Sequence, residues 1–184
     1  MKNIITMLIL SIVLAGCGYS SDSNNDVEIQ EGYDQIENDQ IVFFLSYLDF
    51  ESRYFAGYFV DAGGSKHYYE LGNTDIQDFT NEVIYSFLLE HSTDFPGEDF
   101  LTKEEMDRCY AYLTRVDENA EIIKETEPVY DAPGIELTGV RRQNGVIELI
   151  PICEKSTYSW VSTDEYTEKI IKIFGEDEWF LERK

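Results

Sequence analysis

The sequence predicts an α+β fold, in which two β-hairpins form an antiparallel sheet, each hairpin is followed by a helix, and the helices pack on one face. Three observations lead to this prediction. Glycine-containing turns join two pairs of strand-like segments, apolar stripes at helical spacing follow both pairs, and capping boxes mark helix starts. Because each hairpin and helix has an apolar face, the two kinds of element must cover one another.

The first strand-like region is rich in aromatic and β-branched residues. Its segments 54–61 and 66–71 flank the sequence Ala-Gly-Gly-Ser at residues 62–65. Paired glycines allow the positive φ that a hairpin turn requires. Residues 41–47, which come before this hairpin, are compatible with a further strand or with a short helix.

Two helices are predicted in the middle of the chain. A capping box of Thr74 and Gln77 starts the first, and a second box of Thr102 and Glu105 starts the other. Residues 117–127 continue the second helix or form a separate helical turn. The apolar stripes that define these helices are Ile76, Phe79, Val83, Ile84, Phe87 and Leu88 in the first and Met106, Cys109, Tyr110, Leu113 and Val116 in the second.

The last third of the chain repeats the plan of hairpin and helix. Strand-like segments 135–142 and 146–153 are joined through Asn144-Gly145, which is a strong hairpin signal. Pro151 removes a backbone donor, so the second of these strands is expected to lie at a sheet edge or to end there. A third capping box, Ser162 with Glu165, predicts a final helix that stops near Gly175.

The amino terminus has the pattern of a secretory signal. One positive charge is followed by an apolar run at residues 4–13 and then by small residues. The run is about ten residues long, whereas a helix that spans a membrane needs roughly 20. Residues 1–16 are therefore predicted to be a signal peptide.

The residues Leu14-Ala15-Gly16-Cys17 that end this segment resemble the lipobox of bacterial lipoproteins. The resemblance covers only residues 1–17. It implies that the Cys17 thiol receives a diacylglyceryl group, that the chain is cut before Cys17, and that the protein is held at the extracytoplasmic face of the cell membrane. Two acyl chains on one residue give stable anchoring, which one chain alone does not.

Composition divides the rest of the chain into two parts. Residues 17–40 are polar and acidic, so they are predicted to be a flexible tether that lacks the apolar residues to offset its ordering entropy. Residues 41–184 hold enough apolar residues for a single α+β domain. The formal net charge of −23 argues against a nucleic-acid partner, because phosphate backbones are bound by Lys and Arg clusters. It favours a basic partner, metal ions or simple solubility.

Two cysteines remain in the predicted domain, Cys109 on a helix stripe and Cys153 near a strand end. An exported chain reaches a compartment where disulfides persist, so a bridge between them is one interpretation. The other is that both are buried thiols that behave as small hydrophobic residues.

No sequence motif predicts a reaction or a cofactor. The chain lacks the Walker, Gly-x-Ser-x-Gly, Ser-x-x-Lys and EF-hand patterns. Its two histidines, His67 and His91, lie far apart in sequence, so no metal site is predicted. A carboxylate pair could serve a hydrolase, but with 37 acidic residues some pair always looks plausible.

Tyrosines form the best candidate for a binding face. They recur at Tyr47, Tyr54, Tyr58, Tyr68 and Tyr69. Exposed tyrosines stack on sugars or fill pockets of protein partners, whereas tyrosines on a half-buried sheet usually belong to the core. Asp61 and His67 flank the glycine turn and could converge on a ligand, although a tight hairpin turn is the favoured explanation. The candidate binding face comprises Tyr54, Tyr58, Tyr68, Tyr69, Asp61 and His67.

These observations favour a lipid-anchored domain that does not catalyse a reaction and that binds a basic protein or a cell-wall component. An inhibitor or an immunity-type protein that neutralises a basic toxin is one form of this hypothesis. The alternative is an exported hydrolase that uses a carboxylate pair. A solute receptor of a transporter fits the length less well, because the usual two-lobed receptors are longer.

Overall fold

The computed structural model describes residues 28–49, 54–72, 79–124, 134–155 and 160–175. The predicted signal peptide, Cys17 and the first part of the predicted tether lie outside these residues. Among the helices that these ranges contain, none is both long enough and apolar enough to cross a membrane.

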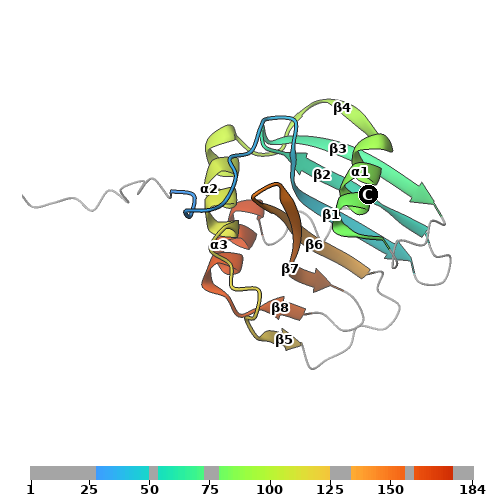
Figure 1. The fold of residues 1–184 in the computed structure, drawn as a ribbon. Coiled ribbons are helices and arrows are strands. Elements are labelled where there is room, and N and C mark those ends of the chain that lie inside the picture. The colour runs from blue at the N-terminus through green and yellow to red at the C-terminus, as the bar shows by residue number, and fades with distance from the viewer. Residues whose placement is uncertain (1–27, 50–53, 73–78, 125–133, 156–159, 176–184) are drawn as a thin grey trace, which may run out of the picture.

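The described residues form three helices and one sheet (Figure 1). The helices are α1 (Asn81–Glu90), α2 (Lys103–Leu113) and α3 (Glu165–Phe174). The strands are β1 (Ile41–Asp49), β2 (Tyr54–Asp61), β3 (Ser65–Gly72), β4 (Ser92–Asp99), β5 (Ile122–Lys124), β6 (Gly134–Gln143), β7 (Val146–Lys155) and β8 (Trp160–Ser162). All strand pairs are antiparallel, and the order across the sheet is β4-β3-β2-β1-β6-β7-β8-β5.

The predicted α+β class and antiparallel sheet are confirmed, but the sheet has eight strands and is larger than two hairpins supply. The segments predicted as hairpins form the pairs β2–β3 and β6–β7. Strand β1 lies between the two pairs. Residues 41–47, for which the sequence left a strand and a short helix open, are therefore a strand. Strands β4, β8 and β5 extend the sheet at its two sides, and none of the three was predicted.

The prediction that all helices pack on one face is wrong. Helices α2 and α3 lie side by side on one face, and α1 covers the other (Figure 1). The central strand β1 requires this arrangement, because its run Ile-Val-Phe-Phe-Leu is apolar on both faces. Phe43 is buried in the core beneath α2 and α3, and Phe44 is buried in the core beneath α1.

Only one of the three predicted helix starts is correct in detail. Thr102 and Glu105 form a full capping box at the start of α2. Helix α1 begins after Thr80, whose hydroxyl accepts from the Val83 amide, and the predicted box of Thr74 and Gln77 lies outside the described residues. At α3 the cap is Asp164 instead of Ser162, since its carboxylate accepts from two amides of the first turn.

Two expectations about the second half of the chain are also corrected. Residues 117–127 were expected to be helical, yet β5 begins at Ile122 and pairs with β8. Pro151 was expected near an edge or a strand end, yet β7 as a whole lies between β6 and β8 and continues to Lys155. At Pro151 itself, however, β7 pairs only with β6, because β8 pairs with β7 only at Cys153 and Glu154. This locally open edge and the register shift of β6 and β7 beside it tolerate the missing backbone donor.

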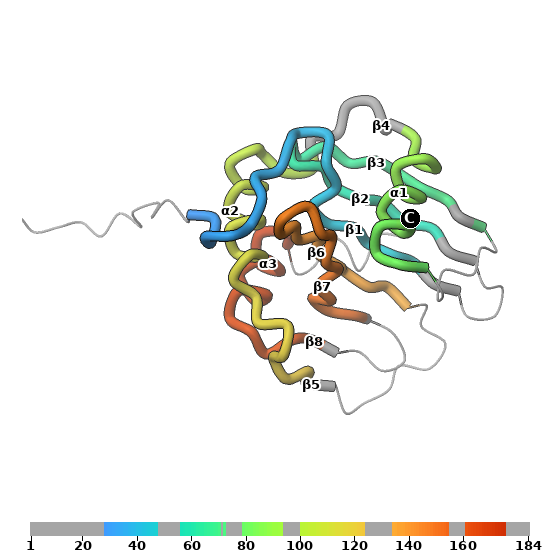
Figure 2. The backbone as a smooth tube through the Cα atoms, in the orientation of Figure 1, coloured from blue at the N-terminus to red at the C-terminus, as the bar shows by residue number. Residues whose placement is uncertain are grey.

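Residues 28–40, which were predicted to belong to the flexible tether, pack against the domain. The Gln30 amide donates to the Thr114 hydroxyl, Tyr33 forms a β-bridge with Gln143, and Ile29 and Ile36 join the core beneath α2 and α3. Figure 2 shows this segment in blue, running beside α2 and the β6–β7 hairpin. The folded domain therefore includes residues 28–40, and the rest of the predicted tether, residues 17–27, lies outside the described residues.

Cys109 and Cys153 are both buried thiols and are not joined by a disulfide. The predicted bridge is thus absent from the structure, and the alternative interpretation describes the two residues. Both lie in the core beneath α2 and α3, where a thiol packs as a small hydrophobic side chain. Burial raises the pKa of Cys109, so this thiol stays protonated and unreactive.

Candidate functional site

Asp61 and His67 converge, but they stabilise a turn. One Asp61 oxygen accepts from the amides of Gly63 and Ser65 at 2.8 and 3.0 Å, and the other lies 2.9 Å from His67 Nε2. His67 also stacks on Phe59. Each oxygen of the carboxylate therefore has a partner within the hairpin.

The structure divides the candidate binding face between the two sides of the sheet. Successive side chains of a strand point to opposite faces. Tyr58 and Tyr68 lie on the face of α2 and α3, with ring centroids 6.1 Å apart. Tyr69 lies in the core beneath α1, on the same face as Asp61 and His67. The Tyr54 side chain lies outside the described residues.

Tyr69 belongs to the core beneath α1. Its hydroxyl donates to the carbonyl of Leu45 at 3.0 Å and lies 3.2 Å from the Ser46 hydroxyl. Gly57 makes room for this hydroxyl, because a Cβ at that position would lie 2.7 Å from it and 1.9 Å from the Leu45 oxygen. Burial raises the pKa of Tyr69, so the phenol remains neutral.

Tyr58 and Tyr68, from the other face of the sheet, line an open groove of about 490 Å³. We call this cavity the tyrosine groove. It lies where β1 ends, β2 begins, β3 ends and β4 begins. Its volume falls within the range of ordinary ligand sites, which is roughly 300–1,000 Å³. The lining residues are Tyr47, Ala56, Gly57, Tyr58, Tyr68, Tyr69, Glu70, His91 and Thr93.

The tyrosine groove combines aromatic rings with polar groups at its rim. Tyr68 is 38% exposed, and Glu70, His91 and Thr93 are exposed as well. Tyr58 is more deeply placed, and burial raises the pKa of its phenol. Lys66 sits 4.3 Å from the centroid of the Tyr58 ring and 4.4 Å from that of Phe100. None of the groove's lining residues is Lys or Arg.

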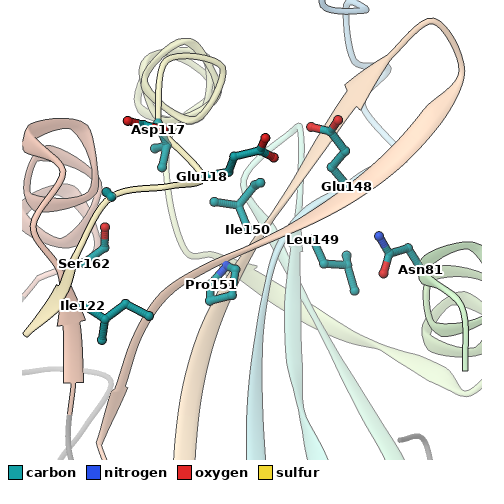
Figure 3. Close-up of a pocket in the computed structure, with 11 residues that line it drawn as sticks. Asn81, Asp117, Glu118, Ile122, Glu148, Leu149, Ile150, Pro151 and Ser162 are labelled. Atoms are coloured by element: carbon teal, nitrogen blue, oxygen red, sulfur yellow. The ribbon is translucent and has the colours of Figure 1, made fainter. Parts of the chain in front are cut away.

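A second cavity, of about 320 Å³, lies along the first half of β7, where β8 does not pair with it. Figure 3 shows Glu118 and Glu148 at its mouth, with Ile150 and Pro151 along β7. Asp117, which follows α2, also lines this acidic cavity. A carboxylate-lined hollow of this kind attracts a cation, unless its carboxylates already have cationic partners.

Arg141 already neutralises part of the acidic cavity. Its guanidinium is 4% exposed, donates to Glu148 at 2.7 Å and to the Val116 carbonyl at 2.9 Å, and lies 3.8 Å from Glu118. A buried guanidinium needs such partners, because an unpaired buried charge is costly. The two glutamates therefore serve the internal ion pair, and the tyrosine groove is the better candidate for a ligand.

A carboxylate pair lies on the opposite face of the sheet from the groove. Glu136 and Glu154 are cross-strand partners on β6 and β7, and both are half-buried. Burial and, to a smaller extent, the charge of Glu154 raise the pKa of Glu136, whereas a hydrogen bond from Thr138 opposes the shift. Neither glutamate lines the tyrosine groove or the acidic cavity.

Sequence reasoning placed Tyr58 and Tyr68 at the candidate site, but it did not assign Glu70, His91 or Thr93 to it. Glu70 shares a face with Tyr68 because the two are separated by one residue, and strand periodicity could have shown this. His91 and Thr93 join the groove through the pairing of β4 with β3. Strand β4 contains Phe95-Pro96-Gly97, which does not resemble a strand, so its pairing was not visible in the sequence.

The comparisons with known proteins add no functional assignment. No family model, no curated protein and no solved structure matches the chain. Among the residues that the structure describes, no group of three or more His, Cys, Asp or Glu side chains is placed to hold a metal ion. The candidate site therefore depends on its own geometry and chemistry.

Proposed function

We propose that this chain is a lipid-anchored extracytoplasmic protein whose folded domain binds a partner and catalyses no reaction. The partner is a basic protein or a cell-wall component. The observation that carries the binding part of the proposal is the tyrosine groove, because it is open, aromatic and bordered by exposed polar groups. Tyrosine supplies a large rigid contact surface with a polar end, and it is enriched where proteins bind partners.

The anchoring part of the proposal rests on residues 1–17, where a short apolar run ends in Leu14-Ala15-Gly16-Cys17. Lipidation at Cys17 would tie the domain to the membrane surface. The net charge of −23 supports a domain that stands away from anionic lipids and attracts basic partners.

The position of the groove in the domain also suits a protein that is anchored through Cys17. Residues 28–40 join the domain beside Thr114 and Gln143, at the end of the sheet where β1 begins and β6 ends. The groove lies where β1 ends, and Tyr47 is six residues further along an extended strand, or roughly 20 Å. A lipid at Cys17 would thus hold one end of the sheet towards the membrane and leave the groove at the other end.

The proposal is tested by expressing the full chain and a Cys17→Ser variant in a bacterial host. We expect the wild-type chain to partition into membranes with a diacylglyceryl mass on its amino-terminal cysteine, and the variant to lose both properties. For the binding part, anchored wild-type protein should retain a ligand from a fractionated cell envelope that a Tyr68→Leu variant retains at least fivefold less well. Equal retention would exclude the groove as the binding surface.

Glu136 and Glu154 favour a second candidate, an exported hydrolase that uses a carboxylate pair. A carboxyl group with a raised pKa beside a second carboxylate is the arrangement that general acid catalysis requires. Turnover of wall glycans or peptides that disappears in a Glu136→Gln variant would establish this candidate. No turnover across such a panel would remove it and leave the binding proposal in place.

A further inference from the structure

We infer that the tyrosine groove receives a cationic side chain, Lys or Arg, from a basic partner protein. This inference rests on the proposed binding function and names the chemistry of its ligand. Three properties of the groove lead to it: the aromatic rings, the carboxylate at the rim and the charge of the whole molecule.

The rings provide the first step. An ammonium or guanidinium group is attracted to the face of a tyrosine within about 6 Å of the ring centroid. The domain already uses this contact internally, since Lys66 lies over Tyr58 and Lys169 lies 4.5 Å from the Tyr166 centroid. Lys66 thus contacts one ring of the groove, while the lining residues themselves include no lysine or arginine.

The rim provides the second step. Glu70 is exposed and shares the Tyr68 face of β3, two residues further along the strand. A carboxylate beside aromatic rings can pair with the charged end of a lysine or arginine, while the rings cover its apolar stem. Ala56 on the neighbouring strand β2 also lines the groove and has a small side chain.

The charge of the molecule provides the third step and decides between ligand classes. With a net charge of −23 on the whole chain, the protein attracts basic proteins over distances comparable with the Debye length and repels anionic polymers. A neutral glycan would gain nothing from this net charge, although its hydroxyls can donate hydrogen bonds to Glu70. The observations therefore favour a basic protein over a wall polysaccharide as the partner.

The test measures binding of three probes to the purified, folded domain at low salt. The probes are a tetralysine peptide, the same peptide with all side-chain amines acetylated, and a neutral oligosaccharide of N-acetylglucosamine. We expect tetralysine to bind and the other two to bind at least tenfold more weakly. Tight binding of the acetylated peptide, or no binding of tetralysine, would overturn the inference.

Matched variants separate the groove from general electrostatic attraction. Glu70→Gln and Tyr68→Leu should each weaken tetralysine binding about fivefold, because each removes one contact worth about that factor. Tyr68→Phe keeps the ring, and Glu31→Gln removes the same charge at the opposite end of the domain, so both should bind within twofold of wild type. Equal losses in Glu70→Gln and Glu31→Gln would contradict a site in the groove.

The outcomes also separate this inference from the proposed function. If the oligosaccharide binds and depends on Tyr68, the cation assignment is wrong while the groove remains the binding surface. If no probe or envelope ligand depends on Tyr68 or Glu70, both proposals fail. The Glu70→Gln variant changes an exposed side chain, so it keeps the test decisive even if Tyr68→Leu does not fold.

Discussion

At the scale of single residues, the interior of the sheet contains polar groups whose positions depend on their neighbours. Tyr69 reaches the Leu45 carbonyl because Gly57 has no side chain. Arg141 can be buried because Glu148 and the Val116 carbonyl accept hydrogen bonds from its guanidinium group. The contact of Tyr69 with Leu45 and that of Arg141 with Val116 join residues 24 and 25 positions apart, so no local pattern predicts them. Arg141 and Glu148 are only seven positions apart and face each other across the β6–β7 hairpin.

The raised pKa of Glu136 leads to a prediction about stability and pH. A Glu side chain in an unfolded chain has a pKa of about 4.3. In the folded state Glu136 binds its proton more tightly than that, so its pKa is raised. Between the unfolded and the folded pKa the native state therefore holds more protons, and stability falls as pH rises through this window. At neutral pH the charged Glu136 destabilises the fold.

A Glu136→Gln variant should therefore be more stable than wild type at pH 7.5, by about 1 kcal/mol or less. The gain should vanish near pH 3.5, where Glu136 is protonated. Urea denaturation at both pH values measures this difference. Glu154→Gln is the matched control, because it removes the repulsion on Glu136 but leaves the larger effect, the burial of Glu136, in place, and should give a smaller gain. A loss of stability in Glu136→Gln at pH 7.5 would contradict the direction of the shift.

At the scale of elements, local signals predicted turns and one cap well and element boundaries less well. Gly64 and Asn144-Gly145 adopt positive φ at the two predicted hairpin turns. The start of α2 was predicted because a capping box is a short local arrangement of hydrogen bonds. Strands β5 and β8 have three residues each, too few to show a period, and their pairing stabilises them.

The capping box at α2 gives a prediction at this scale. Thr102→Ala removes the acceptor for the Glu105 amide and leaves that donor without its side-chain partner. We expect the free energy of unfolding to fall by about 1 kcal/mol, measured by thermal or chemical denaturation. Thr102→Ser keeps the capping hydroxyl, so it serves as the comparison, and an equal loss there would show that the hydroxyl acceptor is not the cause.

At the scale of the whole molecule, the packing of residues 28–40 orients the domain relative to its proposed anchor. If Cys17 is lipidated, residues 18–27 connect the lipid to the first described residue. A flexible tether of that length, as the sequence predicts, would have a mean reach of roughly 18 Å. The β6–β7 turn at Asn144, which lies beside the bridge between Tyr33 and Gln143, should then stay nearer the membrane than the groove.

This orientation is measured with single fluorophores on the anchored protein in vesicles that contain a quencher lipid. A label at Asn144→Cys should be quenched at least twice as strongly as a label at Thr93→Cys on the groove rim. The native thiols Cys109 and Cys153 are buried and should not react with the label. Equal quenching of the two positions, with the protein demonstrably anchored, would show that the domain tumbles freely on its tether.

The sequence by itself determined the α+β class, the two hairpin turns, the cap of α2 and the lipobox-like start. Each of these depends on residues within a few positions of one another, where backbone geometry and local hydrogen bonds decide the outcome. The tertiary structure alone decided that helices cover both faces of the sheet, that Tyr58 and Tyr69 belong to opposite faces, and that His91 joins a groove with Tyr47. These results depend on strand order and register, which long-range burial determines.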